Sequence, residues 1–290
     1  MIESKLFILG AYGQLGRGML ERFPGAKAVD RDTFDMIDQE VIDNYDWSDV
    51  EIIINAAAYT DVDGAETAEG RVAAWQVNAV GVGNLATIAT KIGATLVHFS
   101  NDYVFDGQIY PHLETEPFSP LSVYGQSKAA GDIAAATVAK HYLIRTSWVI
   151  GKGKNFVRTM LGLAEKGVSP NVVGDQTGRP TFVGQLVDAV EHLIKTEAEF
   201  GTYNVSNDGP VVSWADLARE IFKLSGHKNI VVTDITTKDY NASKPLVAPR
   251  PLHGEFDLSK ITATGLKLRS WPDDLIDYFK SVQSISSNLS

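Results

Sequence analysis

Residues 10–16 read Gly10-Ala11-Tyr12-Gly13-Gln14-Leu15-Gly16, between a short apolar run at residues 5–9 and a predicted helix at residues 14–23. Three glycines at this spacing let the backbone turn tightly, approach a pyrophosphate and pack the helix onto a sheet. The pyrophosphate would lie at the helix N-terminus, where unpaired N–H groups and the helix dipole favour an anion. The spacing is GxxGxxG rather than GxGxxG, so an ordinary strand-to-helix turn is the alternative interpretation. The position directly after the first predicted strand favours nucleotide binding.

Short apolar runs alternate with helical patterns along the chain. This alternation is typical of crossover units, in which helices cover both faces of a parallel sheet. The sequence therefore predicts an α/β fold with a doubly wound parallel sheet, a Rossmann fold. Further strands are expected at residues 26–30, 50–55, 95–100, 141–146, 171–173 and 201–205, and helices at residues 38–45, 72–93, 125–140, 155–165 and 183–195.

The regular alternation loosens after residue 150. Ser213 is the expected N-cap of a helix, with Asp216 in the place of the capping-box acid. A final helix is expected from Trp271 to about Lys280, followed by frayed residues 281–290. No linker is recognisable, so a smaller α/β substrate-binding lobe is expected to be woven into the first domain. Residues 1–150, 179–208 and 252–270 would form the dinucleotide-binding domain, and residues 151–178, 209–251 and 271–290 the lobe.

Composition excludes several classes of protein. The 290 residues include 26 Lys and Arg against 36 Asp and Glu, a formal net charge of −10, which argues against a nucleic-acid partner. The absence of cysteine excludes disulfides, thiolate metal sites and a cysteine nucleophile, and the histidines lack metal-binding spacing, so no metal is expected. No stretch approaches the ~20 apolar residues of a membrane helix, and no signal peptide is recognisable. We therefore expect a cytoplasmic protein with no membrane partner.

A phenol and an ammonium group occur four residues apart in Tyr124-Gly125-Gln126-Ser127-Lys128. This spacing places both side chains on one face of a helix that begins near Tyr124. A nearby cation favours the phenolate, so the charge of Lys128 would lower the pKa of Tyr124 and allow it to act as an acid or base near neutral pH. Taken alone, a Tyr and a Lys at this spacing are more often an ordinary pair on the protein surface. Its place after a nucleotide-binding turn and four strands favours a catalytic pair, in which Lys128 also binds a nicotinamide ribose.

The residues that end the second predicted strand bear on the choice of cofactor. Asp30 could accept hydrogen bonds from the adenine ribose hydroxyls of NADH. Arg31, and Arg17 on the first helix, could instead pair with the 2′-phosphate of NADPH. Both arginines could equally be solvated surface charges. The sequence therefore predicts NADPH or NADH without choosing between them.

Taken together, these motifs resemble the dTDP-4-dehydrorhamnose reductase family of the extended short-chain dehydrogenase/reductase superfamily. The resemblance runs from about residue 5 to residue 280. The glycine-rich turn and the Tyr–Lys pair are typical of the whole superfamily, whereas DYVFDG, RTSW and DQ-x-G-x-P-T are typical of these reductases and their near relatives. The matching segments are residues 10–16, 55–60, 102–107, 119–121, 124–128, 145–148, 175–181 and 250–251.

The resemblance implies a role for individual residues. Tyr124 would donate a proton to the C4 keto oxygen of the sugar, and Lys128 would lower the pKa of Tyr124 and hold the ribose. Arg250 would contact the nucleotide diphosphate. The residues expected to bind the cofactor, besides Tyr124 and Lys128, are Gly10, Tyr12, Gly13, Gln14, Leu15, Gly16, Asp30, Arg31, Asn55, Ala56, Ala57 and Tyr59. Those expected to bind the sugar nucleotide, besides Arg250, are Thr60, Val62, Asp102, Tyr103 and Trp148.

The chain departs from the family pattern in three places. Asn101 stands where the family has a catalytic Ser or Thr, so the expectation is that its amide donates to the substrate carbonyl in place of a hydroxyl. Gly254 and Phe256 stand where the family usually has Ser and Leu, which bears on the nucleotide contacts. Gly18 follows Arg17 where some relatives carry acidic residues for a metal-linked dimer. A monomer or weak homodimer without a structural metal is expected.

The function that the resemblance implies is NAD(P)H-dependent reduction of the C4 keto group of dTDP-4-dehydro-L-rhamnose. One alternative is a reductase or epimerase of another nucleotide sugar. A second is a non-catalytic NADP-binding regulatory subunit of a partner enzyme. The Tyr124–Lys128 pair and Trp148 favour catalysis, and Asn101 is the feature that favours its loss.

Overall fold

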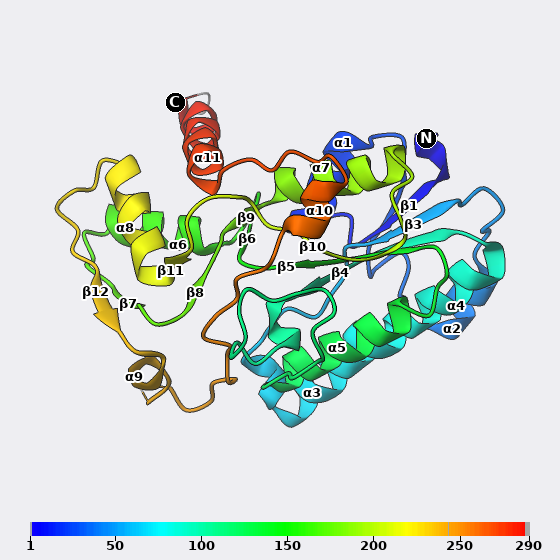
Figure 1. Ribbon diagram of the computed structural model, residues 1–290, viewed down its shortest axis with the longest axis horizontal. Helices are drawn as coiled ribbons and strands as arrows, with labels where there is room; N and C mark the ends of the chain where they lie inside the picture. Colours follow the sequence, from blue (N-terminus) through cyan, green and yellow to red (C-terminus); the bar gives the residue numbers. More distant parts are fainter. Residues whose placement is uncertain (1, 243, 288–290) are drawn as a thin grey trace.

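The computed structural model describes residues 2–242 and 244–287 and is built around a six-stranded parallel sheet (Figure 1). The strand order is β2-β1-β3-β4-β5-β10, and every neighbouring pair is parallel. Such an order needs a crossover connection between successive strands, and it confirms the doubly wound sheet. The strands are β1 (Leu6–Leu9), β2 (Lys27–Val29), β3 (Ile52–Asn55), β4 (Thr95–Asn101), β5 (His141–Thr146) and β10 (Gly201–Asn204).

Helices cover both faces of the sheet because successive strand residues point to opposite sides. Leu6 and Ile8 pack against one layer of helices, and Phe7 and Leu9 against the other. The first layer comprises α1 (Gln14–Arg22), α7 (Val183–Lys195) and α10 (Ser259–Ala263), and the second comprises α2 (Gln39–Asn44), α4 (Val82–Ile92) and α5 (Val123–Ala135).

The single helix predicted at residues 72–93 is interrupted. It starts earlier, at α3 (Ala68–Trp75), passes through a π-helical turn η3 (Gln76–Gly81) and continues as α4. The π turn presents the buried Asn78, whose side chain bonds both backbone groups of Tyr59 and the Ser127 hydroxyl. Such turns are frequent at functional sites, and this one joins the segment after β3 to helix α5.

A second group of elements lies at one end of the sheet and has its own apolar core, which includes Met160, Phe222 and Leu275 (Figure 1). The capping box between Ser213 and Asp216 is present as predicted. This second group comprises α6 (Phe156–Glu165), α8 (Trp214–Leu224), α9 (Thr237–Ala242), α11 (Trp271–Ser287), and the paired strands β7 (Asn171–Val173) with β12 (Thr233–Ile235) and β8 (Thr177–Gly178) with β11 (Val212–Ser213).

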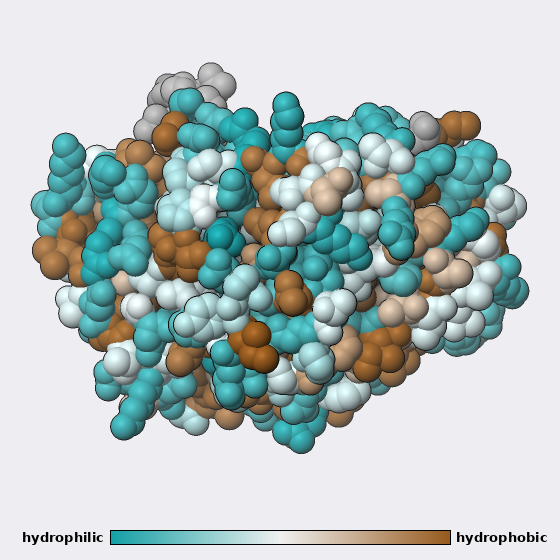
Figure 2. Space-filling view, in the orientation of Figure 1, coloured by the Kyte–Doolittle hydropathy of each residue, from teal (hydrophilic) through white to brown (hydrophobic). Residues whose placement is uncertain are grey.

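Some predicted boundaries are wrong. Helix α5 begins at Val123, where the Ser122 hydroxyl caps it, and ends at Ala135 rather than at residue 140. Helix α11 continues through Ser287, so fraying from residue 281 is not observed; residues 288–290 lie outside the described part of the chain. Over the described residues, no helix has the length and apolar character to span a membrane. The face in Figure 2 carries hydrophobic side chains in scattered patches among hydrophilic ones.

Candidate active site

A cleft of about 760 Å³ lies at the carboxyl ends of the sheet strands, next to the second group of elements. This is where ligands bind in open parallel α/β sheets. Its lining comes from the glycine-rich turn, from the ends of β2, β3, β4 and β5, from α5 and from the start of α8. The cleft therefore joins segments that are far apart in the sequence.

The glycine-rich turn is packed too closely for side chains. Gly10 has a φ of 68°, and a Cβ there would lie 2.6 Å from the Ala57 nitrogen. A Cβ on Gly16 would overlap the Gly10 carbonyl oxygen. Helix α1 begins at Gln14, and its N-cap residue Gly13 has no side chain to cap it, which leaves the first N–H groups of the helix available to an anion. The turn thus fits a pyrophosphate, as predicted.

The residues predicted to bind the cofactor divide into those that line the cleft and those that do not. Lining residues are Gly10, Gly13, Gln14, Leu15, Asp30, Arg31, Ala56, Ala57 and Tyr59, together with Tyr124 and Lys128. Tyr12 points outward and is 57% exposed, and Gly16 acts through close packing. The Asp30 carboxylate accepts a 2.8 Å bond from the Arg31 backbone, while the Arg31 guanidinium is exposed. Both cofactor alternatives are compatible with this arrangement.

Asn55 was expected to line the cofactor site, and the structure corrects this. Its side chain is buried beneath the cleft, 3.1 Å from the His98 Nδ1, and accepts a 3.1 Å bond from the Ala57 nitrogen. Burial and the nearby Lys128 hold the pKa of His98 well below its usual value, so the ring is neutral. Asn55 therefore shapes the alanine segment from below, because its amide bonds the backbone of that segment.

Asn101, Tyr124 and Lys128 come together at the end of β4 and the start of α5. The Asn101 Nδ2 donates a 2.6 Å bond to the Tyr124 hydroxyl oxygen, and its Oδ1 accepts a 3.2 Å bond from the Tyr103 nitrogen. The second bond fixes which end of the amide faces Tyr124. The Lys128 Nζ donates a 2.6 Å bond to the Phe99 carbonyl. The Asn101 amide was expected to donate to the substrate carbonyl; here it donates to the phenol.

Burial dominates the electrostatics of this group. It raises the pKa of Tyr124 above its ordinary value, Tyr103 and Asp102 raise it further, and the bond from Asn101 lowers it. Burial also lowers the pKa of Lys128 to about 8 and raises that of Asp102 to about 7. The pKa of Tyr124 was expected to be lowered by Lys128; in this arrangement burial raises it, and the opposing effect comes from the Asn101 bond.

Four of the residues predicted to bind the sugar nucleotide line the cleft, and two do not. Thr60, Asp102, Tyr103 and Trp148 line the cleft, and the Tyr103 ring meets the Tyr124 ring edge-on at 5.4 Å. Val62 does not reach the cleft lining and packs behind it with Tyr59 and Tyr103.

Arg250 is not among the residues that line the cleft. Its guanidinium forms a 2.7 Å ion pair with Asp63 and donates to the Ala248 carbonyl at 2.9 Å. To contact a diphosphate, the Arg250 guanidinium would therefore have to bind it alongside Asp63 or give up its ion pair with Asp63.

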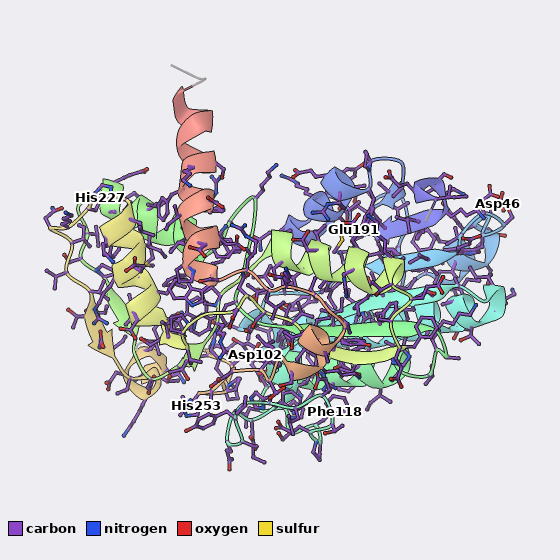
Figure 3. The ribbon with its side chains drawn as sticks, turned by 45° about the horizontal axis from the view of Figure 1, so that its top comes forward. Asp46, Asp102, Phe118, Glu191, His227 and His253 are labelled. Carbon is purple, nitrogen blue, oxygen red and sulfur yellow. The ribbon has the colours of Figure 1, made fainter. Side chains whose placement is uncertain are left out.

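Asp102 is central to the molecule, between the sheet and the second group of elements (Figure 3). A Cβ on Gly254 would lie 2.5 Å from the Asp102 Oδ2. Glycine at position 254, where the family usually has serine, thus has a steric reason: a side chain there would displace the Asp102 carboxylate. In the second group of elements, the Asp175 carboxylate accepts bonds from the Thr237 nitrogen and hydroxyl, and so ties the segment before β8 to the start of α9.

Several side chains that line the cleft were not predicted from the sequence, among them Trp214 and Lys154. Trp214 lines it and stacks on Trp148, with ring centroids 3.6 Å apart and planes 15° from parallel. Lys154 also lines it and adds a positive charge beyond the end of β6 (Val149–Ile150). The sequence signals are a tryptophan at the helix start after Ser213 and a lysine in a glycine-containing loop, and neither is specific.

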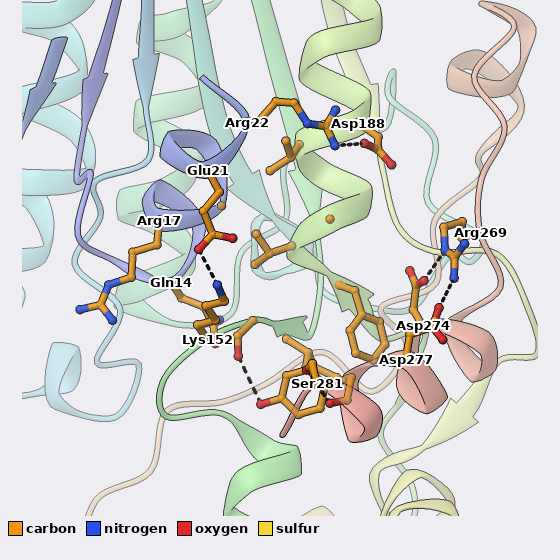
Figure 4. Close-up of a pocket in the computed structure, with 18 residues that line it drawn as sticks. Gln14, Arg17, Glu21, Arg22, Lys152, Asp188, Arg269, Asp274, Asp277 and Ser281 are labelled. Carbon is orange, nitrogen blue, oxygen red and sulfur yellow. Dashed lines mark hydrogen bonds and ion pairs between the residues drawn. The ribbon is translucent and has the colours of Figure 1, made fainter. Parts of the chain in front are cut away.

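A second cavity, of about 420 Å³, lies between α1, α7 and α11 (Figure 4). Its charged side chains largely pair with each other, as in the bonds of Lys152 to Glu21 and of Arg22 to Asp188. It shares Gln14 with the cleft but holds none of the acid–base residues.

Known proteins resemble the chain over nearly its whole length. Residues 4–284 match the family model described as RmlD substrate binding domain. The dTDP-4-dehydrorhamnose reductase of Aggregatibacter actinomycetemcomitans is 37% identical, over 92% of this chain and 96% of that protein. The spore coat polysaccharide biosynthesis protein SpsK of Bacillus subtilis is 34% identical, over 97% of this chain and 99% of that protein.

A solved structure shows the same likeness. The dTDP-4-dehydrorhamnose reductase of Bacillus anthracis, in complex with NADP, has a TM-score of 0.87 and 34% identity, covering 95% of this chain and 98% of that one. The sequence comparison and the fold comparison agree. The chain belongs to the RmlD family, that of the dTDP-4-dehydrorhamnose reductases.

Proposed function

We propose that the protein reduces the C4 keto group of dTDP-4-dehydro-L-rhamnose to give dTDP-L-rhamnose, with NADPH or NADH as reductant. The observation that carries this proposal is the contact of Asn101 with Tyr124, beside Lys128 and in the same cleft as the glycine-rich turn. The names of its relatives and the NADP complex of the Bacillus anthracis enzyme support the same reaction.

The reduced dinucleotide would supply a hydride to the sugar C4. In this proposal the turn at Gly10, Gly13 and the start of α1 binds the pyrophosphate, and Asp30 and Arg31 face the adenosine ribose. Lys128 would hold the nicotinamide ribose and keep a positive charge beside the reacting oxygen. The absence of room for a Cβ at Gly10 and Gly16 supports the fit to a pyrophosphate.

Tyr124 would be the proton donor. The Asn101 N–H already occupies one lone pair of the phenolic oxygen, so the phenolic O–H is left to point at the substrate oxygen. The raised pKa of Tyr124 keeps the phenol protonated, so its proton is present for transfer to the alkoxide that would form at C4. As the C4 oxygen gains charge, the phenol would transfer its proton, and Asn101 would stabilise the phenolate that remains.

The division of the chain into a dinucleotide-binding domain and a substrate-binding lobe is part of this proposal. The separate apolar core around Met160, Phe222 and Leu275 supports it. Tyr103 and Trp148 would form an apolar wall against the 6-deoxy side of the sugar, and Trp214 stacks on Trp148.

The test is to incubate the protein with dTDP-4-dehydro-L-rhamnose and NADPH or NADH in parallel, following cofactor oxidation and sugar product. We expect one cofactor oxidised per sugar reduced. An epimerase would convert the sugar without net cofactor consumption. A regulatory subunit would bind NADP tightly and leave both compounds unchanged, and either result would overturn the proposal.

A further inference from the structure

The backbone of Trp148 adopts a conformation that an aromatic residue rarely takes. Its φ is 48°, and among the described non-glycine residues only Glu197 also has a positive φ. The residue directly follows the Arg145-Thr146-Ser147 segment, and its carbonyl accepts a 3.2 Å bond from the Thr181 nitrogen. Unusual backbone of this kind persists only where surrounding contacts hold it.

Two contacts hold the Trp148 indole. Trp214 stacks on it, with centroids 3.6 Å apart. Gly178 lies beside the same indole, because a Cβ there would come 3.3 Å from Cε2 and 3.5 Å from Nε1. Phe156 packs on Trp214 at 4.6 Å, which limits where Trp214 itself can move.

The topology explains why these residues meet. Strand β8 pairs with β11 so that Gly178 lies opposite Val212 and Thr177 opposite Ser213. Trp214 follows directly, at the first turn of α8, whose start is fixed by the capping box of Ser213 and Asp216. The pairing of β8 with β11 therefore places Trp214 against Trp148, which lies two residues after the end of β5.

We infer that Trp214 is a positioning residue for sugar binding, which holds Trp148 in the wall of the cleft. The inference rests on the proposed function, since it assigns the stacked pair to the sugar side of that site. Both indoles line the cleft, and together they present a continuous apolar surface suited to a sugar face that lacks a hydroxyl. Trp214 acts through Trp148 rather than on the reacting atoms, which lie at Tyr124.

The test compares Trp214→Leu, Trp214→Phe, Trp148→Leu and the double variant Trp148→Leu/Trp214→Leu. Trp75→Leu is the matched control, since Trp75 is 40% exposed on α3 and outside the cleft lining. For each protein, KM for dTDP-4-dehydro-L-rhamnose, kcat and the Kd for NADPH are measured, together with the Kd for dTDP-L-rhamnose by calorimetry.

We expect Trp214→Leu to raise KM about three- to tenfold with little change in kcat, as for loss of one aromatic stacking contact. Trp214→Phe should keep most of the stacking contact, so its KM should stay close to that of the unmodified protein. The Kd for NADPH should not change in any variant. The double variant should be no worse than Trp148→Leu alone, because residues that act as a unit are not additive.

Additive effects in the double variant, or an unchanged KM in Trp214→Leu, would overturn the inference. A weaker NADPH Kd alongside the raised KM would also overturn it, since this would indicate general damage to the fold. Absence of turnover by the unmodified protein contradicts the proposed reaction instead, and the calorimetric Kd values then decide the inference by the same comparison of single and double variants.

Discussion

The Asn101 Nδ2 donates a hydrogen bond of 2.6 Å to the phenolic oxygen of Tyr124, while the other end of the same amide is held by the Tyr103 backbone. The amide is therefore oriented by its own backbone neighbourhood and lowers the pKa of a phenol that burial raises. In this geometry Asn101 supplies an N–H donor to Tyr124 where the family resemblance implies a hydroxyl residue, although an amide cannot relay a proton.

Replacing Asn101 by alanine should lower kcat about tenfold or more, because a charge-stabilising hydrogen bond to the developing phenolate is lost. Asn101→Thr, which restores the family's hydroxyl, should stay within about tenfold of the unmodified protein, since one donor replaces another. Steady-state kinetics with NADPH measure both. A hundredfold gain from Asn101→Thr would show that asparagine is a poor substitute, and full activity of Asn101→Ala would remove it from the mechanism.

Gly16→Ala should weaken cofactor binding by about ten- to a hundredfold, the scale of losing one hydrogen bond to a charged group. The added methyl would overlap the Gly10 carbonyl, so the turn must move. Gly162→Ala is the matched control, because a Cβ there meets nothing within 4 Å. Fluorescence titration with NADPH measures both variants. Normal affinity in Gly16→Ala would contradict the role of this turn.

The pKa of Lys128, lowered by burial to about 8, predicts an alkaline limit to activity. The ammonium group is charged below this value and neutral above it, so kcat should fall as the pH rises through about 8. In Lys128→Arg the charge persists at higher pH, and the limit should move upward even if kcat is reduced. A pH profile of kcat that is the same in both proteins would contradict the assignment.

Burial raises the pKa of Asp102 from 3.8 to about 7, and this has a consequence for stability. Between these values the folded protein binds more protons than the unfolded chain, so the free energy of unfolding should decrease as the pH rises through this window. Urea unfolding of Asp102→Asn should show a smaller decrease, since the amide does not titrate. Asp49→Asn, at an exposed position, is the control and should keep the slope of the unmodified protein.

The sequence predicts most of the fold because its apolar patterns are strong and local. Three predicted elements, at residues 141–146, 171–173 and 183–195, coincide with β5, β7 and α7. The π turn at Asn78 was not predictable in this way, because the bonds that Asn78 makes there are to the Tyr59 backbone and the Ser127 hydroxyl, both distant in the sequence. Local periodicity continues through it without a break.

The site was predictable where a motif fixes the geometry and less so where packing does. Tyr124 and Lys128 share one helix, so their spacing alone placed them in the same cleft. The position of the Asn55 side chain depends on the buried His98, and Trp214 reaches Trp148 only through the pairing of β8 with β11. Contacts of this kind join segments that no short pattern connects.

The most direct test of the central claim is to supply NADPH deuterated on the transferred position together with dTDP-4-dehydro-L-rhamnose, and to analyse the sugar by mass spectrometry and NMR. The account predicts that the unmodified protein places deuterium at C4 of the product. Tyr124→Phe should bind NADPH normally yet form product at least about a hundredfold more slowly, as for loss of a general acid. Product without deuterium at C4, or an unimpaired Tyr124→Phe, would contradict it.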